Sequence, residues 1–397
     1  MSTVTFDVVR ASTKYVVDEN GDLSQVAANT PAFEYNADGT YKGMLVEEER
    51  ENGIRNSEAG GSTNGVIGSG GALPTNWQAI NLNGIGVEVI GTGTEKGVEY
   101  VDIKFSGTAT ATTSPFIRFE STSQISAAQN EVWSGSVYMK YTDQTANPDL
   151  IRLAIVAFNA GLGVASVDYE TVSLTSTLTR YKNENVELTD ATTASVNTVV
   201  YFTITNGQLY DFTVRFGLPQ LEESPCVTSV IKTTSAAVER LRDDIKNTSA
   251  TTYVGQTSGT IYAEVQVDQL ETTQSYILQA HDATDASNWR LILGNFNPNF
   301  NWQLRYGSGN TIAFTSASST GNHKLALVYT DGDVRAYLDG TQVGSSSTSW
   351  GDFTSNELDT IHIGAAHFGG SEFNNWVRAF AFYKRALSDN EAKILTQ

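Results

Sequence analysis

Cysteine is almost absent from this sequence, and that absence excludes one class of structural support. The 397 residues include a single cysteine, Cys226. One cysteine cannot form a disulfide within the chain, and it cannot build a cysteine-rich zinc site. Histidine is also scarce, with four residues at positions 281, 323, 362 and 367. A disulfide-stapled fold and a histidine-centred enzyme are therefore both disfavoured.

Long apolar runs and an excess of basic residues are missing as well. No stretch approaches the roughly 18 consecutive apolar residues of a membrane helix. The start, MSTVTFDVVRAS, lacks a basic segment followed by an apolar run, so no signal peptide is predicted. The 25 basic residues against 44 acidic ones give a net charge of −19, which disfavours binding to nucleic-acid phosphates and to anionic lipid. We expect a chain that is made in a cytoplasm and binds neither nucleic acid nor membrane.

Short alternating runs dominate what is present. Runs of alternating apolar and polar residues bounded by Gly, Asn, Asp or Ser are typical of antiparallel β-sandwiches. The clearest runs are residues 98–107, 133–141, 149–158, 198–204 and 208–217. Helical periodicity is confined to residues 236–245 and to residues 388–397, where Ser388 and Glu391 have the spacing of a capping box. The prediction is an all-β fold with little helix and two antiparallel β-sandwich (jelly-roll) domains.

Composition suggests where these domains begin and end. A mixed, charged segment precedes a Gly/Ser-rich stretch that ends at Pro74, and such a stretch is typical of a connector. The predicted divisions are an N-terminal segment 1–60, a connector 61–76, a β-sandwich 77–232, a linker 233–255 containing a short helix or turn, and a second β-sandwich 256–397.

The last division carries a family resemblance. Its segment NHKLALVYTDGDVRAYLDGTQVGS, residues 322–345, reads as strands joined by tight turns. The segment resembles the laminin-G-like, concanavalin A-like family through His323, Tyr329, Asp331, Gly332, Tyr337, Asp339 and Gly340. The resemblance implies a sandwich fold shared by lectins, adhesive modules and glucanases, so activity must be argued from particular residues.

Catalysis is disfavoured in this division because its carboxylates are badly placed. Glycosidases of this fold use two carboxylates on one strand face. Here Glu264, Asp268 and Glu271 have the wrong parity, since Asp268 and Glu271 fall on opposite faces. The interpretation is therefore a binding module and not an enzyme.

Sugar binding would use aromatic rings beside amides and carboxylates, because the C–H face of a sugar ring is apolar. Trp350 is the first choice, since it stands in a Ser/Thr-rich run that predicts exposure. The alternative for the other tryptophans is burial in the core. The candidate carbohydrate-binding residues are Trp350, Asp352, Asn356, His367, Phe368, Trp289, Trp302 and Tyr306.

Calcium is the one metal that the resemblance leaves open. Asp282 and Asp285 could join such a site, and a solvated turn is the alternative. No cofactor is required by the interpretation.

The middle division resembles a carbohydrate-binding-like jelly-roll module that is common in bacteriophage tail and fibre proteins. The resemblance is carried by a strand in residues 132–143 and by residues 217–245. The matching positions are Gln220, Leu221, Glu222, Thr228, Ser229, Ile231, Thr233, Ala237, Val238 and Arg240.

The N-terminal segment is similar to a segment that begins such phage proteins. The charged stretch GMLVEEERENGIRNSE, residues 43–58, belongs to that pattern. The segment keeps Arg10, Ala11, Ser12, Tyr15, Val16, Asp18, Gly21, Ala27, Ala28, Asn29, Pro31, Phe33, Tyr35, Gly43, Leu45, Glu47, Glu48, Arg50, Asn52, Ser57 and Glu58. We expect a strand with Met44 and Val46 inward, an ion pair of Arg50 with Glu47 or Glu48, and a turn capped by Asn52.

Together the resemblances imply a phage virion protein, such as a tail fibre, that adheres to host surface glycans through its C-terminal division. They also imply other virion proteins as partners, a homotrimer, and a chain made in the host cytoplasm and located in the virion. A purely structural part, such as a capsid decoration or head fibre, is one alternative. A polysaccharide depolymerase is another.

Overall fold

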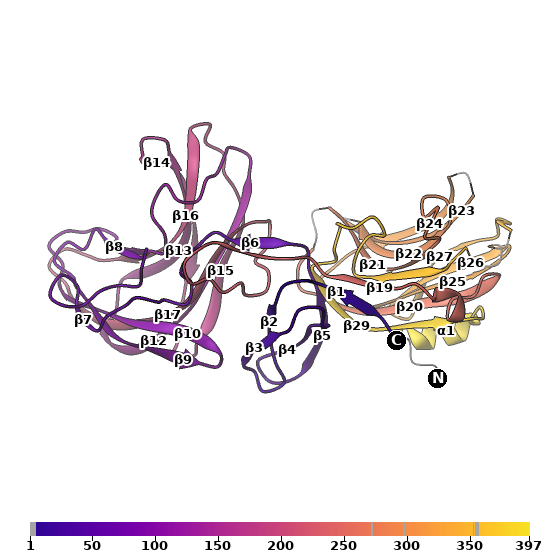
Figure 1. Cartoon of the computed structure of the whole chain (residues 1–397), viewed down its shortest axis with the longest axis horizontal. Coiled ribbons are helices and arrows are strands. Elements are labelled where there is room, and N and C mark those ends of the chain that lie inside the picture. The colour runs from indigo at the N-terminus through magenta and orange to yellow at the C-terminus, as the bar shows by residue number, and fades with distance from the viewer. Residues whose placement is uncertain (1–4, 271–272, 297, 308, 352, 354–356) are drawn as a thin grey trace. The chain divides into compact units, whose positions relative to one another are not determined.

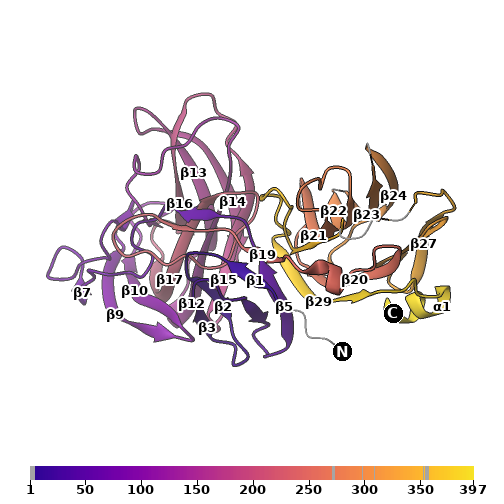
Figure 2. The same cartoon turned by 45° about the vertical axis from the view of Figure 1, so that its right-hand side comes forward.

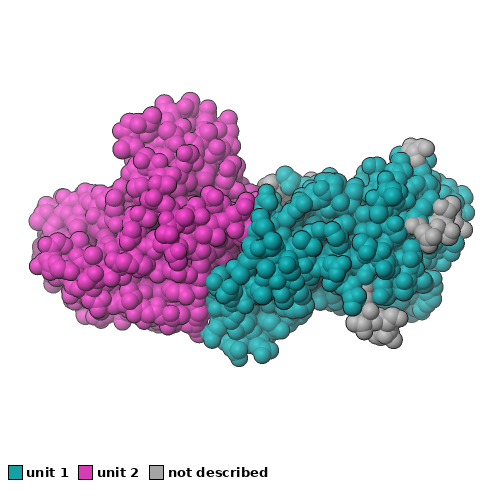
Figure 3. All heavy atoms as spheres, viewed as in Figure 1, with its two compact units in different colours: residues 1–49, 241–397 teal, residues 50–240 magenta. Residues whose placement is uncertain are grey.

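A computed structural model describes residues 5–270, 273–296, 298–307, 309–351, 353 and 357–397. The chain forms two compact units (Figure 3). Unit 1 consists of residues 1–49 and 241–397, and unit 2 consists of residues 50–240. Strands make up most of both units (Figure 1). The prediction of an all-β fold with little helix is confirmed.

Unit 2 is a sandwich of two main antiparallel sheets. The six-stranded sheet contains, in spatial order, Thr179–Glu187 (β15), Val132–Ala146 (β12), Leu209–Glu223 (β17), Val98–Thr108 (β10), Gly86–Glu95 (β9) and Gly65–Val66 (β7). The five-stranded sheet contains Val164–Val172 (β14), Leu150–Asn159 (β13), Thr193–Thr203 (β16), Phe116–Arg118 (β11) and Gln78–Ile80 (β8). Strands Arg50–Asn52 (β6) and Val238–Arg240 (β18) form a separate pair.

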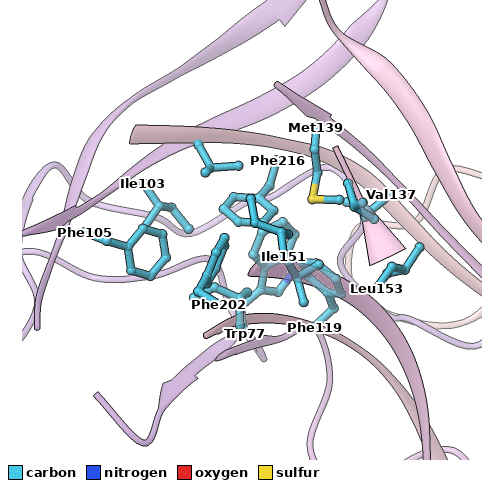
Figure 4. Packing of buried hydrophobic residues seen from close by; sticks show 14 of the residues in the cluster. Trp77, Ile103, Phe105, Phe119, Val137, Met139, Ile151, Leu153, Phe202 and Phe216 are labelled. Carbon is cyan, nitrogen blue, oxygen red and sulfur yellow. The ribbon is translucent and has the colours of Figure 1, made fainter. Parts of the chain in front are cut away.

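The alternation in the sequence produces the core of unit 2. Strands β10, β12, β13, β16 and β17 coincide with the five alternating runs, and alternate side chains of a strand point to one face. Inward rings from both sheets meet, as Figure 4 shows for Phe105, Phe202 and Phe216. The centroids of Phe105 and Phe202 are 4.8 Å apart, and those of Phe202 and Phe216 are 6.4 Å apart.

Unit 1 is a second sandwich, built from two seven-stranded sheets that we call sheet A and sheet B. Sheet A contains Asp7–Val9 (β1), Asp244–Asn247 (β19), Thr360–Ile363 (β28), Gln274–His281 (β21), Arg290–Phe296 (β22), Asn299–Tyr306 (β23) and Asn310–Ala317 (β24). Sheet B contains Thr341–Ser346 (β27), Asp333–Leu338 (β26), Gly321–Thr330 (β25), Ser258–Val267 (β20), Asn375–Tyr383 (β29), Tyr41–Val46 (β5) and Phe33–Tyr35 (β4). The hairpin Lys14–Val17 (β2) and Leu23–Val26 (β3), a 3-10 turn at Ala250–Thr252 and the helix Asp389–Leu395 (α1) complete it; Figure 2 shows the same elements from a second side.

The predicted N-terminal segment 1–60 is shared between the two units. Strands β1, β4 and β5 extend the sheets of unit 1, while β6 belongs to unit 2. Met44 pairs with Val377 of β29, and Met44 and Val46 are buried in the core between the sheets, as predicted. Asn52 caps its turn as predicted, since its Oδ1 accepts a hydrogen bond from the Ile54 N–H at 3.1 Å.

Buried ion pairs explain why the N-terminal segment joins unit 1. The Lys14 ammonium lies 2.8 Å from Glu47 and 2.7 Å from Asp243. The Arg10 guanidinium lies 2.6 Å from the other oxygen of Asp243. All four side chains are almost completely buried, and a buried charge is tolerated only when it is paired. Glu47 of the charged stretch is therefore a buried, paired group of unit 1 and is not a solvated surface group.

The prediction of a short helix or turn at 236–245 is wrong. Residues 238–240 form β18 and residues 244–247 form β19. Each strand finds a partner far away in the sequence, because β18 pairs with β6 and β19 pairs with β1 and β28. The second helix prediction is confirmed. Ser388 caps α1, and the side chain of Glu391 completes the capping box.

Candidate functional site

The outer face of sheet A carries the polar side chains of the candidate site. In β28 the isoleucines at 361 and 363 enter the core, so His362 points to the opposite face. In β19 Ile245 enters the core, and its neighbours Asp244 and Lys246 lie on the same outer face as His362, because Lys246 pairs with His362. Strand pairing thus gathers basic, acidic and imidazole groups at one place on the sheet.

The segment between β28 and β29 adds an aromatic ring to this face. Three glycines in it have positive φ angles, namely Gly364 at +71°, Gly369 at +76° and Gly370 at +80°. A Cβ atom at Gly364 would lie 2.6 Å from the side chain of Val46, so only glycine allows the chain to leave the core there. The turns place His367 and Phe368 at a pocket. Phe368 is 64% exposed.

The pocket has a volume of about 170 Å³. It is mostly polar, with the ring of Phe368 at its edge. The lining residues are Arg242, Asp243, Asp244, Lys246, His362, Ala365, Ala366, His367, Phe368, Gly369 and Glu372. All belong to unit 1. The pocket is smaller and more polar than a typical pocket for a drug-sized ligand, and it places one exposed ring beside convergent polar groups.

Three of the four histidines form a cluster, and two of them, His362 and His367, line the pocket. The rings of His281 and His362 stack with centroids 5.1 Å apart, and those of His281 and His367 lie 5.3 Å apart. His281 Nδ1 is 3.0 Å from the Asp282 carbonyl oxygen, so that nitrogen is assigned the proton. His281 Nε2 then accepts a hydrogen bond from His362 Nδ1–H at 2.9 Å. His362 Nε2 is left as an acceptor, 3.5 Å from Asp244.

The environment keeps this cluster neutral at pH 7. Burial, together with the neighbouring imidazole of His281, lowers the pKa of His362 to about 4. Burial, His281 and Arg290 lower the pKa of His367 to about 4. Burial also lowers the pKa of His281. Neutral imidazoles can donate and accept hydrogen bonds with ligand hydroxyls without carrying charge.

Arg290 contacts the histidine cluster through His367. Its NH1 group is 3.4 Å from His367 Nδ1, so that nitrogen accepts and His367 Nε2–H is left as a donor. Arg290 is 5% exposed, and its Nε–H has no hydrogen-bond partner among the described residues. The guanidinium therefore fixes the orientation of His367 beside Phe368.

Of the predicted sugar-binding residues, His367 and Phe368 lie at this pocket. Asp352 and Asn356 fall outside the described residues. Trp289 and Tyr306 are half-buried against the core of unit 1, and Trp302 is completely buried in it. Neither Trp289, Trp302 nor Tyr306 lines the pocket.

The predicted exposure of Trp350 is wrong. The side chain is 6% exposed and packs against Phe353 with ring centroids 4.8 Å apart. Its indole N–H donates to the Thr330 carbonyl oxygen at 3.1 Å, and its backbone N–H donates to Asp331 at 2.7 Å. The Ser/Thr-rich run thus closes over the core with this ring turned inward.

Asp282 and Asp285 both stabilise the local turn. Asp282 Oδ1 accepts hydrogen bonds from the Thr284 and Asp285 backbone N–H groups at 2.7 and 3.0 Å. These bonds outweigh burial and lower the pKa of Asp282. Asp285 accepts two bonds from the Asn288 amide at 3.1 Å. In the described part of the chain, no group of three or more His, Cys, Asp or Glu side chains is arranged to hold a metal ion.

Two of the carboxylates considered as hydrolytic groups in β20 and just after it form ion pairs. Glu264 forms an ion pair with Arg378 at 3.0 Å, and Asp268 forms one with Lys42 at 2.6 Å. Glu271 falls outside the described residues.

Sequence reasoning missed Arg242, Asp244, Lys246 and Glu372 as pocket residues. A helix or turn was expected over residues 236–245, so the alternation of Asp244, Ile245 and Lys246 was not interpreted as a strand. That alternation is the signal that could have placed Asp244 and Lys246 on one strand face.

Comparison with known proteins gives one family match. The family described as the concanavalin A-like lectin/glucanases superfamily matches residues 242–393, which make up most of unit 1. This part of the chain is therefore similar to lectin-type sandwiches, and the resemblance inferred from its sequence is confirmed there. No curated protein matches the chain. Among the described residues, no helix has the length and apolarity required to cross a membrane.

Solved structures share only general similarity. The CBM40 module of the Ruminococcus gnavus IT-sialidase is 15% identical, with a TM-score of 0.32, covering 36% of this chain and 84% of that chain. Domain 4 of AbnA, a GH43 arabinanase from Geobacillus stearothermophilus, is 15% identical, with a TM-score of 0.33, covering 44% and 84%. The SAP-like pentraxin of Limulus polyphemus is 13% identical, with a TM-score of 0.29, covering 36% and 70%.

Proposed function

We propose that unit 1 binds glycans at the pocket beside Phe368. The observation that carries the proposal is the 64% exposure of the Phe368 ring at the edge of a polar pocket. Exposing a large apolar ring to water is unfavourable unless a partner covers it. The apolar face of a sugar ring is such a partner, and its hydroxyls then reach His362, His367 and Glu372. The family match over residues 242–393 supports a lectin-like role.

The proposal is binding without bond cleavage. Hydrolysis of a glycosidic bond needs an acid and a second carboxylate on either side of it. The carboxylates at the pocket have structural roles: Asp244 pairs with Lys246 at 2.9 Å, and Glu372 accepts a hydrogen bond from the Gly370 N–H at 3.1 Å. Incubation with host polysaccharide followed by a reducing-sugar assay tests this point, and release of new reducing ends would favour a depolymerase.

We further propose that the chain is a bacteriophage surface protein, such as a tail fibre, that uses this pocket to adhere to its host. The support is the sequence resemblance of residues 1–60 and 77–232 to phage proteins. Homotrimers would multiply weak sugar sites through avidity. Labelling of phage particles with an antibody against unit 1 tests the location, and label on the head would favour a capsid decoration.

Calcium at Asp282 and Asp285 also stays a proposal, which binding assays with and without a chelator would test.

The binding proposal is tested by Phe368→Ala, with Ile394→Ala as the matched control. Ile394 on α1 is 61% exposed and is absent from the pocket lining, so both changes remove an exposed apolar side chain. We expect Phe368→Ala to weaken binding to the host envelope glycan at least about tenfold, equivalent to about 1.4 kcal/mol. The melting temperature should stay unchanged in both variants. Equal glycan binding by the two variants would contradict the proposal.

A further inference from the structure

Arg242 has no anionic partner among the residues that the structure describes. It lies just before β19 and is exposed. It forms no ion pair or hydrogen bond with any residue that the structure describes. Ion pairs with carboxylates are made by Arg10, Arg55, Arg215, Arg335, Arg378 and Arg385. Arg242 is thus an exposed cation without a carboxylate partner.

The position of Arg242 is set by the segment that carries Phe368. A Cβ atom added at Gly369 would lie 2.3 Å from Arg242 NH1 and 2.6 Å from its Cζ. The guanidinium therefore packs against the backbone at Gly369, the residue next to Phe368. Glycine leaves room for the guanidinium and also adopts the φ of +76° that this turn requires. The cation and the exposed ring are placed together on the pocket wall.

The other charged groups of the pocket already have partners. Lys246 pairs with Asp244, and Asp243 pairs with Arg10 and Lys14. Glu372 accepts a hydrogen bond from the Gly370 N–H. Among the described lining residues, Arg242 is the cation that remains available to a ligand.

We infer that the Phe368 pocket takes an acidic saccharide, with the sugar ring on Phe368 and a carboxylate on Arg242. This inference rests on the proposed glycan binding and names its ligand class. A guanidinium presents two parallel N–H donors that match the two oxygens of a carboxylate. The acceptor His362 Nε2 and the donor His367 Nε2–H are available to hydroxyl groups of the same sugar. A sulfated sugar shares the anionic chemistry and is separated from a carboxylated one by experiment.

The test is isothermal titration of the full chain with an oligouronide, with the same oligosaccharide after reduction of its carboxyl groups, and with a sulfated neutral oligosaccharide. We expect the oligouronide to bind at least about tenfold more tightly than its reduced form. The preference should shrink as salt is added, because the contact is ionic and partly exposed. Tighter binding of the sulfated sugar would overturn the assignment of a carboxylate.

Arg242→Gln should remove the preference for the oligouronide and leave binding of the reduced form nearly unchanged. Arg242→Lys should retain part of the preference for the oligouronide, because lysine keeps the positive charge but lacks the two parallel N–H donors of the guanidinium. Gly369→Ala should act like Arg242→Gln by displacing the guanidinium, and its melting temperature must be compared because the turn is strained by alanine. Arg385→Gln is the control, since Arg385 pairs with Glu391 and does not line the pocket.

The outcomes separate the inference from the function on which it rests. Equal binding of both oligosaccharides by the natural chain, with loss in Phe368→Ala, would overturn the acidic ligand while glycan binding stands. Binding of neither oligosaccharide, nor of host envelope glycan, would overturn both. A preference for the oligouronide that survives Arg242→Gln would overturn the role of Arg242.

Discussion

Two buried basic residues of the N-terminal segment show how single side chains decide where a segment belongs. Lys14 contacts both Glu47 and Asp243, and Arg10 contacts Asp243 and three backbone carbonyls. Desolvating these charges is expensive, and only nearly complete pairing and hydrogen bonding offsets the cost. The network therefore favours a single docked arrangement of residues 10–47 against the strand that begins at Asp244.

Lys14→Met should destabilise unit 1 by roughly 3 kcal/mol, because it removes the cation that both buried carboxylates contact. Urea unfolding followed by tryptophan fluorescence measures the change. The double variant Lys14→Met/Glu47→Gln should recover part of the loss, because it also removes one of the buried negative charges. If Lys14→Met were as stable as the natural chain, the ion pairs of Lys14 would contribute nothing to the free energy of unfolding.

Trp350→Ala should cost about 3–5 kcal/mol of stability and leave glycan binding at the Phe368 pocket intact. The ring fills the core beside Tyr329 and Phe353, and its removal leaves a cavity. Trp350→Phe should lose less, since most of the ring volume remains. Thermal unfolding and glycan titration together distinguish this result from loss of a binding residue, which would weaken binding without lowering the melting temperature.

At the scale of elements, local pattern predicted what local interactions determine. The alternating runs became β10, β12, β13, β16 and β17, and the spacing of Ser388 and Glu391 became the cap of α1. The prediction of a helix or turn at residues 236–245 was wrong because apolar residues at helical spacing fall in two short strands. Each of these strands is paired with a partner that is distant in the sequence. The predicted exposure of Trp350 was wrong for the same reason, since the rings of Tyr329 and Tyr306 that cover it are remote in sequence.

The imidazole cluster on β21 and β28 should make stability depend on pH. The pKa of His362 is about 4 in the folded chain, against an ordinary 6.5. Between these values the unfolded chain binds more protons, so the free energy of unfolding falls as the pH drops from about 7 to about 4. His362 should contribute a loss on the order of 1–3 kcal/mol, and below about pH 4 its contribution should stop changing.

Denaturant titrations of the natural chain and of His362→Gln at several pH values isolate this contribution. Carboxylates also titrate near pH 4, but they do so in both proteins. The glutamine variant should show the shallower loss of stability between pH 7 and pH 4. Parallel curves for the two proteins would mean that His362 is as easily protonated in the folded chain as in the unfolded one.

For the whole molecule, sequence reasoning found two sandwiches and two of the pocket residues, His367 and Phe368. It did not find that residues 1–49 complete the second sandwich, because β1, β4 and β5 acquire their role only through pairing with strands about 200 or more residues away, or with each other at the edge of sheet B. The cationic side of the pocket was missed likewise, since Arg242 meets Gly369 only in the folded chain.

The continuity of unit 1 leads to a prediction about excising unit 2. Arg50 and Arg240 are directly paired in the β6–β18 ladder, so the chain enters and leaves unit 2 at neighbouring positions. The Asp243 N–H also donates to the Glu47 carbonyl oxygen at 2.9 Å, which holds the two segments of unit 1 together at this point. A short Gly/Ser linker in place of residues 51–239 should therefore give a folded unit 1 that retains the Phe368 pocket.

Residues 241–397 alone should fold poorly, because loss of β1, β4 and β5 uncovers core side chains such as Val377 and removes Lys14 and Arg10 from Asp243. Circular dichroism, thermal unfolding and glycan titration of both proteins test this, with Phe368→Ala in the linked protein as the binding control. If residues 241–397 alone proved as stable as the linked protein, the N-terminal segment would be an appendage of the sandwich and not part of it.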